Sequence, residues 1–513
     1  MIQIKDLTII HNKDLRTILS NFNLVLNDGD KAVIIGEEGN GKSTLLKWLY
    51  NPQLIDSYCQ YQGQRIVQNH RLAYLGQELS QEDGAKTIYE YFLQFTSFLE
   101  QTTNQLAKLA ITFEMKTDIF YSNQLMESLS GGERIKIQLM ALLMTEPDVL
   151  LLDEPSNDID LQTLLTLQDV INDFPHIVLF ISHDEVLIEN TANVIVHLEQ
   201  IIRKTTSRYT VVRNDYKSYI NQRLNIFEKQ RQLAIADKRE KALRDQRYQK
   251  ILQSVQHKLN TVSRQDPSTA KNLKDKMHTV KSIGKRFEKE DKKMTAMPQQ
   301  EEAIFLTLNN ENNNIAAGKI VLDYQLDKLV SQDGKTVLAN NIKLFIKGPR
   351  KVCIIGKNGI GKTTLLKNIL KHLSETSNLK IAYMPQNYQE LLNTDITPVA
   401  YLADGGQKET TTWVRTCLGS MKYTTDEMEH PIKELSGGQK AKLFLLKMSL
   451  SNASVLVLDE PTRNFSPLSA PVIRKLIKEF SGTVISVSHD RKYIYEVADE
   501  VYELKTDGLH LIS

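Results

Sequence analysis

The chain contains one set of short motifs twice, and this internal repeat constrains the fold more than any other feature. Three motif residues of the first copy, Ser130, Asp153 and His183, each recur 306 positions later. A glycine-rich stretch at 36–44 recurs at 356–364, an offset of 320, so the second copy is shorter upstream of its later motifs. A constant offset across three motifs is typical of homologous repeats. The sequence therefore predicts two domains of the same kind.

Each copy has the pattern of an α/β domain. A short apolar run, 31–35 or 351–355, ends at a glycine and is followed by a helical pattern. A strand, a glycine-rich loop and a helix in this order form the context that a phosphate-binding GxxxxGK[ST] loop requires. Its backbone N–H groups and the helix N-terminus are expected to bind phosphate oxygens. The predicted loop residues are Gly36, Gly39, Gly41, Lys42, Ser43 and Thr44, and then Gly356, Gly359, Gly361, Lys362, Thr363 and Thr364.

An acidic pair closes a long aliphatic run in each copy. The pairs are Asp153 with Glu154 and Asp459 with Glu460, and each is expected at the carboxyl end of a buried parallel strand, where α/β sheets bind ligands. The first acid is placed to hold Mg²⁺, and the second to activate a water as general base. A single strand-end Glu is more often a solvated cap, but the phosphate loop upstream favours the catalytic interpretation.

A histidine follows the next apolar run in each copy. His183 comes after residues 177–181, and His489 comes after residues 484–487. A lone histidine is usually structural, but a phosphate loop and an acidic pair precede both of these. We therefore interpret His183 and His489 as sensors of a nucleotide γ-phosphate.

Together these motifs resemble the ATP-binding-cassette superfamily over roughly residues 1–205 and 301–513. The resemblance also rests on a glutamine and a Leu-Ser-Gly-Gly signature in each copy, namely Gln77, Ser130, Gly131 and Gly132, and then Gln386, Ser436, Gly437 and Gly438. It implies an ATPase whose cofactors are ATP and Mg²⁺, with the metal held by Ser43, Gln77, Asp153, Thr363, Gln386 and Asp459. It also implies that the cassettes close head to tail, with each ATP between the phosphate loop of one and the signature of the other.

The second copy departs from this family pattern at one position. Family members carry an Asp five residues after the Pro that follows the catalytic Glu. The first copy keeps it as Asp160, but the second has Ser466, which cannot provide a carboxylate. We therefore expect unequal coupling of the two sites, although both catalytic Glu residues are present. His11 is a candidate for stacking on adenine in the first copy, and the second copy offers no equivalent.

The near-neutral formal charge of +2 conceals a strong internal polarity. Residues 213–298 carry 22 Lys/Arg and 10 Asp/Glu, a net of +12, so the remainder of the chain is −10. Apolar residues at three- and four-residue spacing predict an antiparallel pair of helices with an a/d-like seam, the first helix running from Tyr216 to Val262 and the tip lying at 262–270. The seam residues are Ile251, Leu252, Val255, Leu259 and Val262, and then Leu273, Met277, Val280, Ile283, Phe287 and Met294.

A solvated charged coiled coil is the plainer interpretation of this segment. The one-sided charge favours a nucleic-acid contact instead, because a merely soluble helix would alternate its signs. Two cassettes joined by a basic hairpin resemble the ABC-F family, and the variant at 462–467 resembles its bacterial antibiotic-resistance (ribosomal protection) group. This resemblance implies binding at the exit site of the 70S ribosome. The linker would approach 23S rRNA, the P-site tRNA and the peptidyl-transferase centre, and would dislodge lincosamide, pleuromutilin or streptogramin A antibiotics.

The predicted fold class is thus α/β, with two P-loop ATP-binding-cassette domains joined by a long antiparallel α-helical hairpin. We expect cassettes at 1–205 and 301–513 and the linker at 206–300. No apolar run approaches the roughly 18 residues of a membrane helix, and three scattered cysteines fit a reducing cytoplasm. We expect a monomer whose cassettes dimerise within the chain, with no membrane partner. The alternatives are a housekeeping ABC-F translation factor and, less favoured, the fused ATPase subunit of an ABC importer, which leaves the basic hairpin unexplained.

Overall fold

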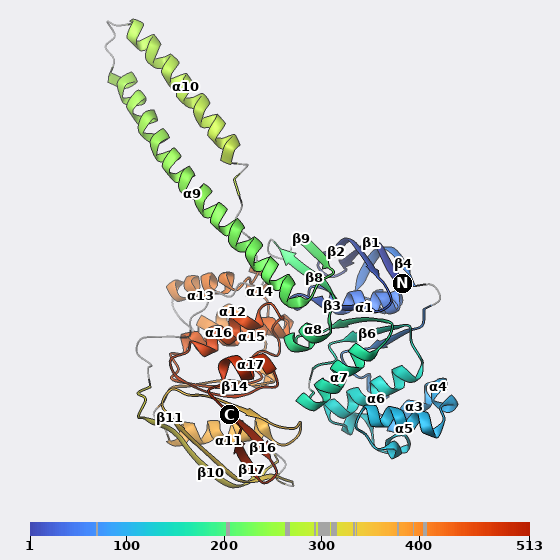
Figure 1. The fold of residues 1–513 in the computed structure, drawn as a ribbon. Helices are drawn as coiled ribbons and strands as arrows, with labels where there is room; N and C mark the ends of the chain where they lie inside the picture. The colour runs from blue at the N-terminus through green and yellow to red at the C-terminus, as the bar shows by residue number, and fades with distance from the viewer. Residues whose placement is uncertain are drawn as a thin grey trace. The chain divides into compact units, whose positions relative to one another are not determined.

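The computed structural model describes residues 1–67, 70–157, 159–201, 206–261, 267–291, 294–295, 308, 315–331, 334, 336–376, 379–392, 394–403 and 408–512. It divides into two compact units (Figure 1). One unit comprises Met1–Tyr216 with Glu301–Ser513, and therefore holds both cassettes. The other comprises Lys217–Gln300, and therefore holds most of the helical hairpin. None of the described helices is both long enough and apolar enough to cross a membrane.

The first cassette is built on a six-stranded sheet of order β5-β6-β7-β3-β8-β9, in which only β9 runs antiparallel to its neighbour. Its strands are β3 (Lys31–Ile35), β5 (Leu72–Leu75), β6 (Val149–Asp153), β7 (Ile177–Ile181), β8 (Val194–Ile201) and β9 (Thr206–Val212). Every residue of β3, β6 and β7 is buried, which explains why their sequences are continuous apolar runs rather than alternating ones. A separate antiparallel sheet contains β1 (Ile2–His11), β2 (Thr17–Leu26) and β4 (Cys59–Ile66).

The helices of this cassette follow the strand ends that carry the motifs. They are α1 (Lys42–Tyr50), α2 (Gln81–Gly84), α3 (Ile88–Leu93), α4 (Thr96–Glu100), α5 (Thr103–Thr112), α6 (Gly131–Met144), α7 (Leu161–Asp173) and α8 (Glu185–Thr191), with 3₁₀ turns η1 (Pro52–Ile55), η2 (Thr117–Tyr121) and η3 (Met126–Ser128). The signature helix α6 begins at a capping box, in which the Ser130 hydroxyl accepts the Glu133 N–H and the Glu133 carboxylate accepts the Ser130 N–H. The signature therefore lies at a well-defined helix N-terminus.

The second cassette repeats this topology, which confirms the predicted duplication and fold class. Its main sheet has the corresponding order β13-β14-β15-β12-β16-β17. The strands are β10 (Ile320–Val330), β11 (Val337–Lys347), β12 (Lys351–Ile355), β13 (Ile381–Met384), β14 (Val455–Asp459), β15 (Thr483–Val487), β16 (Glu500–Lys505) and β17 (Gly508–Leu511). Between the phosphate-loop helix and β13 the described residues contain no counterpart of β4. The missing strand accounts for the shorter spacing in this copy.

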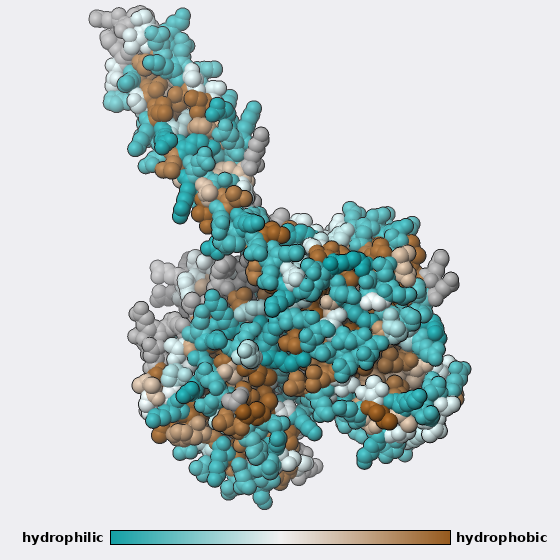
Figure 2. Space-filling model, viewed as in Figure 1, coloured by the Kyte–Doolittle hydropathy of each residue, from teal (hydrophilic) through white to brown (hydrophobic). Residues whose placement is uncertain are grey.

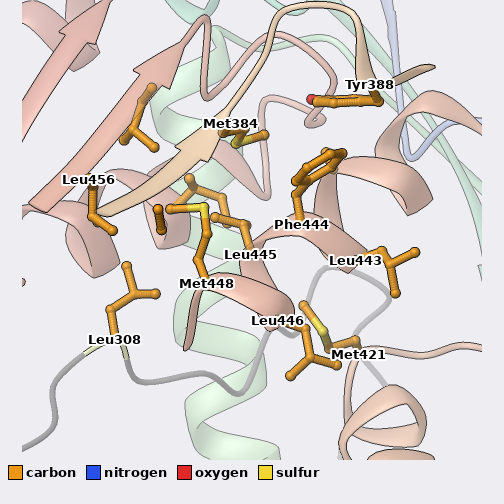
Figure 3. Packing of buried hydrophobic residues seen from close by; sticks show 14 of the residues in the cluster. Leu308, Met384, Tyr388, Met421, Leu443, Phe444, Leu445, Leu446, Met448 and Leu456 are labelled. Atoms are coloured by element: carbon orange, nitrogen blue, oxygen red, sulfur yellow. The ribbon is translucent and has the colours of Figure 1, made fainter. Parts of the chain in front are cut away.

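The core of the second cassette holds its signature helix α15 (Gly437–Leu450) against the sheet (Figure 3). Met448 and Leu445 of α15 belong to the same buried cluster as Met384 of β13 and Leu456 of β14. The rings of Tyr388 and Phe444 lie 5.2 Å apart at the top of this cluster. The other helices are α11 (Lys362–Thr376), α12 (Pro398–Ala403), α13 (Lys408–Ser420), α14 (Thr425–Glu429), α16 (Ala470–Lys478) and α17 (Arg491–Val497), with η4 (Tyr388–Glu390) and η5 (Ile432–Glu434).

The linker is an antiparallel helical hairpin, as predicted. Helix α9 (Tyr216–Thr261) pairs with α10 (Pro267–Asp291) through Lys241 and Asp291, whose charged atoms lie 2.7 Å apart. Farther along, the rings of Tyr248 and Phe287 lie 5.8 Å apart. Val262 and the other predicted tip residues up to 266 lie outside the described residues, and residues 267–270 form the first turn of α10.

The predicted seam of the hairpin is correct in part. Leu273 and Val280 are buried, but Ile251 and Ile283 are 53% and 39% exposed, so their assignment to the seam is wrong. Consecutive helical positions are separated by about 100°, so Ile251 cannot share the face of its half-buried neighbour Leu252. Hydrophilic residues cover most of the hairpin face in Figure 2, and a line of hydrophobic residues runs along it.

Candidate nucleotide sites in the two cassettes

The first phosphate loop depends on glycine for its shape. Gly39 and Gly41 have φ values of 78° and 85°, in the left-handed region that L side chains rarely adopt. At Gly41 a Cβ would lie 2.1 Å from the side chain of Ile18, so a larger residue is excluded by space as well. The Lys42 ammonium donates to the carbonyl oxygens of Gly36 at 2.9 Å and Glu37 at 3.1 Å. The loop is therefore closed around its own lysine at the N-terminus of α1.

The second phosphate loop has the same geometry. Gly356, Gly359 and Gly361 all have positive φ values, and the Lys362 ammonium donates to the carbonyl of Gly356 at 2.8 Å and of Lys357 at 3.0 Å. Thr363 and Thr364 follow in the first turn of α11, as Ser43 and Thr44 do in α1. Both loops thus place a lysine, a hydroxyl and free helix N-terminal N–H groups at one sheet edge.

The strand-end aspartates lie beside these loops and could hold Mg²⁺. The Ser43 hydroxyl donates to one Asp153 oxygen at 2.9 Å, and the Tyr74 hydroxyl donates to the other at 3.1 Å. Burial raises the pKa of Asp153 to about 6. Asp459 is equally buried, and neither of its carboxylate oxygens makes a hydrogen bond within strict geometric limits; burial raises its pKa, and the nearby Thr363 hydroxyl opposes that shift. A buried carboxylate short of hydrogen-bond donors is costly unless a cation satisfies it, so these residues fit a divalent metal.

The set of protein donors is small, which also fits Mg²⁺ bound together with a nucleotide. No group of three or more His, Cys, Asp or Glu side chains within the described part of the chain could hold a metal by itself. Mg²⁺ typically takes one or two protein ligands and completes its octahedral shell with waters and substrate phosphates. One aspartate and one hydroxyl beside each phosphate loop correspond to that arrangement.

Glu154 is the centre of a dense polar network in the first cassette. Its carboxylate accepts from the side-chain amides of Gln77 at 3.1 Å and Asn157 at 2.5 Å, and lies 3.3 Å from His183 Nε2. The other ring nitrogen of His183 lies 2.8 Å from the carbonyl oxygen of Phe465, in the second cassette. Burial alone would raise the pKa of Glu154, but the charge and hydrogen bond of His183 bring it down to about 2. The site therefore holds an ionised carboxylate.

The equivalent pair in the second cassette has a different electrostatic state. The nearest approach of the His489 ring to the Glu460 carboxylate is 3.8 Å, which is too long for a hydrogen bond. The His489 backbone N–H donates to Glu460 at 3.2 Å. Burial therefore raises the pKa of Glu460 to about 8 and lowers that of His489 to about 4. The two Glu-His pairs share a sequence pattern, but the pKa of the glutamate is lowered in the first and raised in the second.

Residues of both cassettes surround the second phosphate loop. A cavity of about 500 Å³ brings Lys362, Gln386, Asp459 and Glu460 together with His183 of the first cassette. A second cavity, of about 700 Å³, is lined by the signature residues Ser130 and Gly132 and by residues 357–358 of the loop. Gly131 is the first residue of α6. The signature of the first cassette thus faces the phosphate loop of the second cassette across this cavity.

The opposite interface is closed by two glutamates of the first phosphate loop. Glu38 accepts the backbone N–H of Gly438, in the signature of the second cassette, at 2.7 Å. Glu37 reaches Ser466, whose hydroxyl donates to it at 2.6 Å. The cavity that remains beside the signature residue Ser436 has a volume of only about 30 Å³. Gly437, between Ser436 and Gly438, is the first residue of α15.

Several of these residues were absent from the sequence prediction. Tyr74 and Asn157 hold the acidic pair of the first cassette, and Glu37 and Glu38 cross to the second. A comparison of the two phosphate loops could have singled out Glu37 and Glu38, because the second copy has Lys and Asn at the equivalent positions. His11, the candidate for adenine stacking, has its ring nitrogen 2.7 Å from Asp14.

The fold and the paired sites define a class of protein with two nucleotide-binding cassettes in one chain. A family model described as ABC transporter matches residues 19–157 and 339–463, just over half of the sequence. The chain therefore belongs to the ABC transporter family. The ATP-binding domain of this family implies ATP binding, typically with Mg²⁺, and ATPase activity.

The chain is also similar over nearly its whole length to curated relatives. It is 28% identical to the ribosome protection protein VmlR of Bacillus subtilis (strain 168), over 96% of this chain and 85% of the relative. It is 25% identical to ABC transporter F family member 5 of Arabidopsis thaliana, over 96% and 73%. Among solved structures, an archaeal ribosome recycling factor in complex with a ribosomal stalk protein matches with a TM-score of 0.58 and 16% identity, covering 99% of this chain and 90% of that one. That likeness shows the shared fold.

Proposed function

We propose that the chain is an ABC-F ATPase that binds the exit site of the 70S ribosome and reaches the P-site tRNA and peptidyl-transferase centre with its hairpin. The observation that carries this proposal is the charge of the hairpin. Residues 246–287 contain ten Lys/Arg and only two Asp/Glu. A polyanion of defined shape, such as rRNA or tRNA, is the partner that such a surface recognises.

The hairpin neutralises little of this charge internally: Arg286 pairs with Glu290 at 3.2 Å, and the other ion pairs described in the hairpin join cations outside 246–287. Among the described residues, every acidic member of a hairpin ion pair lies outside 246–287, at Glu228, Asp245, Glu290 or Asp291. Lysines toward the end where α9 meets α10 are exposed, including Lys250, Lys258, Lys271, Lys274 and Lys276. The cationic surface therefore lies on the part of the hairpin farthest along the chain from the cassettes.

The similarity to VmlR supports both the ribosome and the finer role. That relative is named a ribosome protection protein, and its similarity spans cassettes and linker alike. We therefore propose that the chain dislodges antibiotics of the lincosamide, pleuromutilin or streptogramin A type. A housekeeping ABC-F translation factor would share every structural feature described above, so drug susceptibility separates the two functions.

The ATPase roles follow from the geometry of the two sites. Lys42 and Lys362 would bind nucleotide phosphates, Glu154 and Glu460 would orient the attacking water, and Glu154, with its lowered pKa, is the better placed of the two to accept the proton of that water. His183 and His489 would contact the γ-phosphate from the adjacent strand end. Mg²⁺, held by the hydroxyl, glutamine and aspartate of each cassette, would neutralise phosphate charge. Serine and glycine N–H groups of the facing signature would complete each site.

Trapping on ribosomes tests the ribosome-bound state. In Glu154→Gln with Glu460→Gln, ATP should still bind but hydrolysis should stop, so the protein should accumulate on 70S ribosomes in ATP and not in ADP. Co-sedimentation through a sucrose cushion measures this accumulation. Equal amounts in the pellet with and without ATP would refute an ATP-driven ribosome factor.

Expression in a susceptible bacterium tests the drug function. The unmodified chain should raise the inhibitory concentrations of at least one of the three drug classes, and Glu154→Gln with Glu460→Gln should abolish the increase. Ribosome trapping without any change in susceptibility would assign the chain to translation in general and not to resistance.

A further inference from the structure

Glu37 is a buried carboxylate that links the first phosphate loop to the second cassette. One of its oxygens accepts from the hydroxyls of Ser466, at 2.6 Å, and Ser469, at 2.5 Å. The other lies 3.2 Å from the ammonium of Lys442, on the signature helix α15. Burial alone would raise the pKa of Glu37, but Lys442 and the two serines bring it down to about 2. The carboxylate is therefore charged and fully engaged across the interface.

The reciprocal interface carries the opposite distribution of charge. There the residue equivalent to Ser466 is Asp160, and it lines one cavity with Lys357, the equivalent of Glu37. Burial lowers the pKa of Lys362, and Asp160 is among the carboxylates that oppose this shift. In each interface a carboxylate thus lies at the position where residue 160 or its equivalent 466 meets the phosphate loop of the other cassette. Around the second phosphate loop this carboxylate is Asp160, which follows the Asp-Glu pair of the first cassette. Around the first phosphate loop it is Glu37, which belongs to the loop itself.

We propose that Glu37 is a positioning residue that supplies, from the first phosphate loop, the carboxylate that is missing at Ser466. Glu37 would position Lys42 through its own backbone carbonyl. The carbonyl of Glu37 accepts from the Lys42 ammonium at 3.1 Å, so anchoring the Glu37 side chain fixes one of the two carbonyls that hold Lys42. The inference rests on the proposed nucleotide site at Lys42, and it makes the first site dependent on the second cassette before any signature contact with nucleotide forms.

The arrangement explains why an aspartate at position 466 would be harmful here. It would place a second carboxylate against Glu37 with only Lys442 to balance both, and like charges in a buried site cost free energy. Glu37→Gln in the same chain would restore a single negative charge and would offer an amide donor to the new carboxylate. The two substitutions should therefore compensate each other.

The test is a double-mutant cycle on nucleotide binding at the first site alone. Lys362→Ala disables the second phosphate loop, and the dissociation constant of mant-ATP is then measured for Glu37→Gln, Ser466→Asp and their combination. Each single variant should weaken binding about tenfold, as expected for the loss of a hydrogen-bonded charged contact. The combination should return to within about threefold of the background. Glu100→Gln, an exposed glutamate of the same cassette, is the matched control and should change nothing.

The outcomes separate this inference from the proposed function. Circular dichroism and urea unfolding of each variant establish that it folds. Glu37 does not act as the missing carboxylate if Glu37→Gln binds mant-ATP as tightly as Glu100→Gln. The same conclusion follows if the loss of binding free energy in the combined variant equals the sum of the losses in the two single variants. If the Lys362→Ala background itself binds no mant-ATP, the nucleotide site at Lys42 is refuted and the inference falls with it.

Discussion

The guanidinium of Arg474, in α16 of the second cassette, lies 2.6 Å from the carboxylate of Glu185, in α8 of the first. Both side chains are almost completely buried, at 3% and 5% exposure. Lys492 donates to the same glutamate at 3.0 Å, and Arg474 also donates to Glu496 at 2.7 Å. The two cassettes are therefore joined by a buried ionic network as well as by the contacts at the nucleotide sites.

Removing one member of this network should destabilise the paired cassettes strongly. Glu185→Gln leaves Arg474 buried without its main counter-charge, and breaking a buried ion pair in this way costs about 3–5 kcal/mol. The midpoint of urea unfolding measures the loss. Glu189→Gln is the matched control, because Glu189 contacts Lys492 from a position that is 28% exposed, and it should cost less than about 1 kcal/mol. Equal effects of the two variants would show that Arg474 is not compensated by Glu185.

The native Glu38 carboxylate should weaken nucleotide binding at the first site, because it competes with the nucleotide. The carboxylate accepts the N–H of Gly438 at 2.7 Å, and this N–H is among the groups that we propose for nucleotide binding. Glu38→Asn introduces the residue that the second loop already carries as Asn358. In the Lys362→Ala background this change should tighten mant-ATP binding about tenfold, because the ligand no longer displaces a charge-assisted hydrogen bond. The reciprocal Asn358→Glu in a Lys42→Ala background should weaken binding; no change in either direction would contradict the competition.

Acid should remove the contribution of Glu37 to stability. Its pKa falls from 4.5 to about 2 on folding. A depressed acid stabilises the folded state above the unfolded pKa, and this stabilisation is lost as the pH falls toward the folded pKa. At neutral pH the shift corresponds to about 3 kcal/mol. The difference in urea unfolding between the unmodified chain and Glu37→Gln should therefore shrink as the pH is lowered from about 5 to about 2. A difference independent of pH would exclude an ionised Glu37.

Neutralising the end of the hairpin should reduce the salt dependence of ribosome binding. Lys271, Lys274 and Lys276 are exposed near the start of α10. Their replacement by Gln should lower affinity and reduce the slope of log affinity against log salt by about 0.7–0.9 per lost phosphate contact. The matched control replaces three exposed lysines of the cassettes, Lys5, Lys116 and Lys343. An unchanged slope in the hairpin variant, or an equal fall in the control, would argue against an RNA contact at this end.

Sequence reasoning predicted the parts of the molecule that depend on local pattern. The phosphate loops need glycine at Gly41 and Gly361 for backbone geometry, and the strands before Asp153 and Asp459 are apolar because both faces are buried. Such constraints act on neighbouring residues, so they are visible in one copy and repeated in the other. The helical period likewise predicted the hairpin, although Ile251 shows that a period does not decide which of two adjacent apolar residues is buried.

The contacts between cassettes could not be predicted in this way. Glu37 and Ser466 are 429 positions apart, and only the packing of two folded domains brings them within hydrogen-bonding distance. The absence of an aspartate at 466 predicted unequal coupling of the two sites, and the structure places a carboxylate there from the other cassette. The opposite pKa shifts of Glu154 and Glu460 arise in the same way, from distances to His183 and His489 that identical motifs leave undetermined.

Site-specific cross-linking tests whether the hairpin contacts ribosomal RNA or tRNA when ATP is bound. A photoreactive amino acid at position 271, in the Glu154→Gln and Glu460→Gln background, is irradiated with 70S ribosomes in ATP, and the cross-linked RNA is mapped by primer extension. A hairpin that reaches the peptidyl-transferase centre should cross-link to 23S rRNA near that centre or to P-site tRNA, and these cross-links should depend on ATP and be absent with the reactive group at position 116. Cross-links that are absent from these RNAs, or that form equally without ATP, would contradict an ATP-dependent contact.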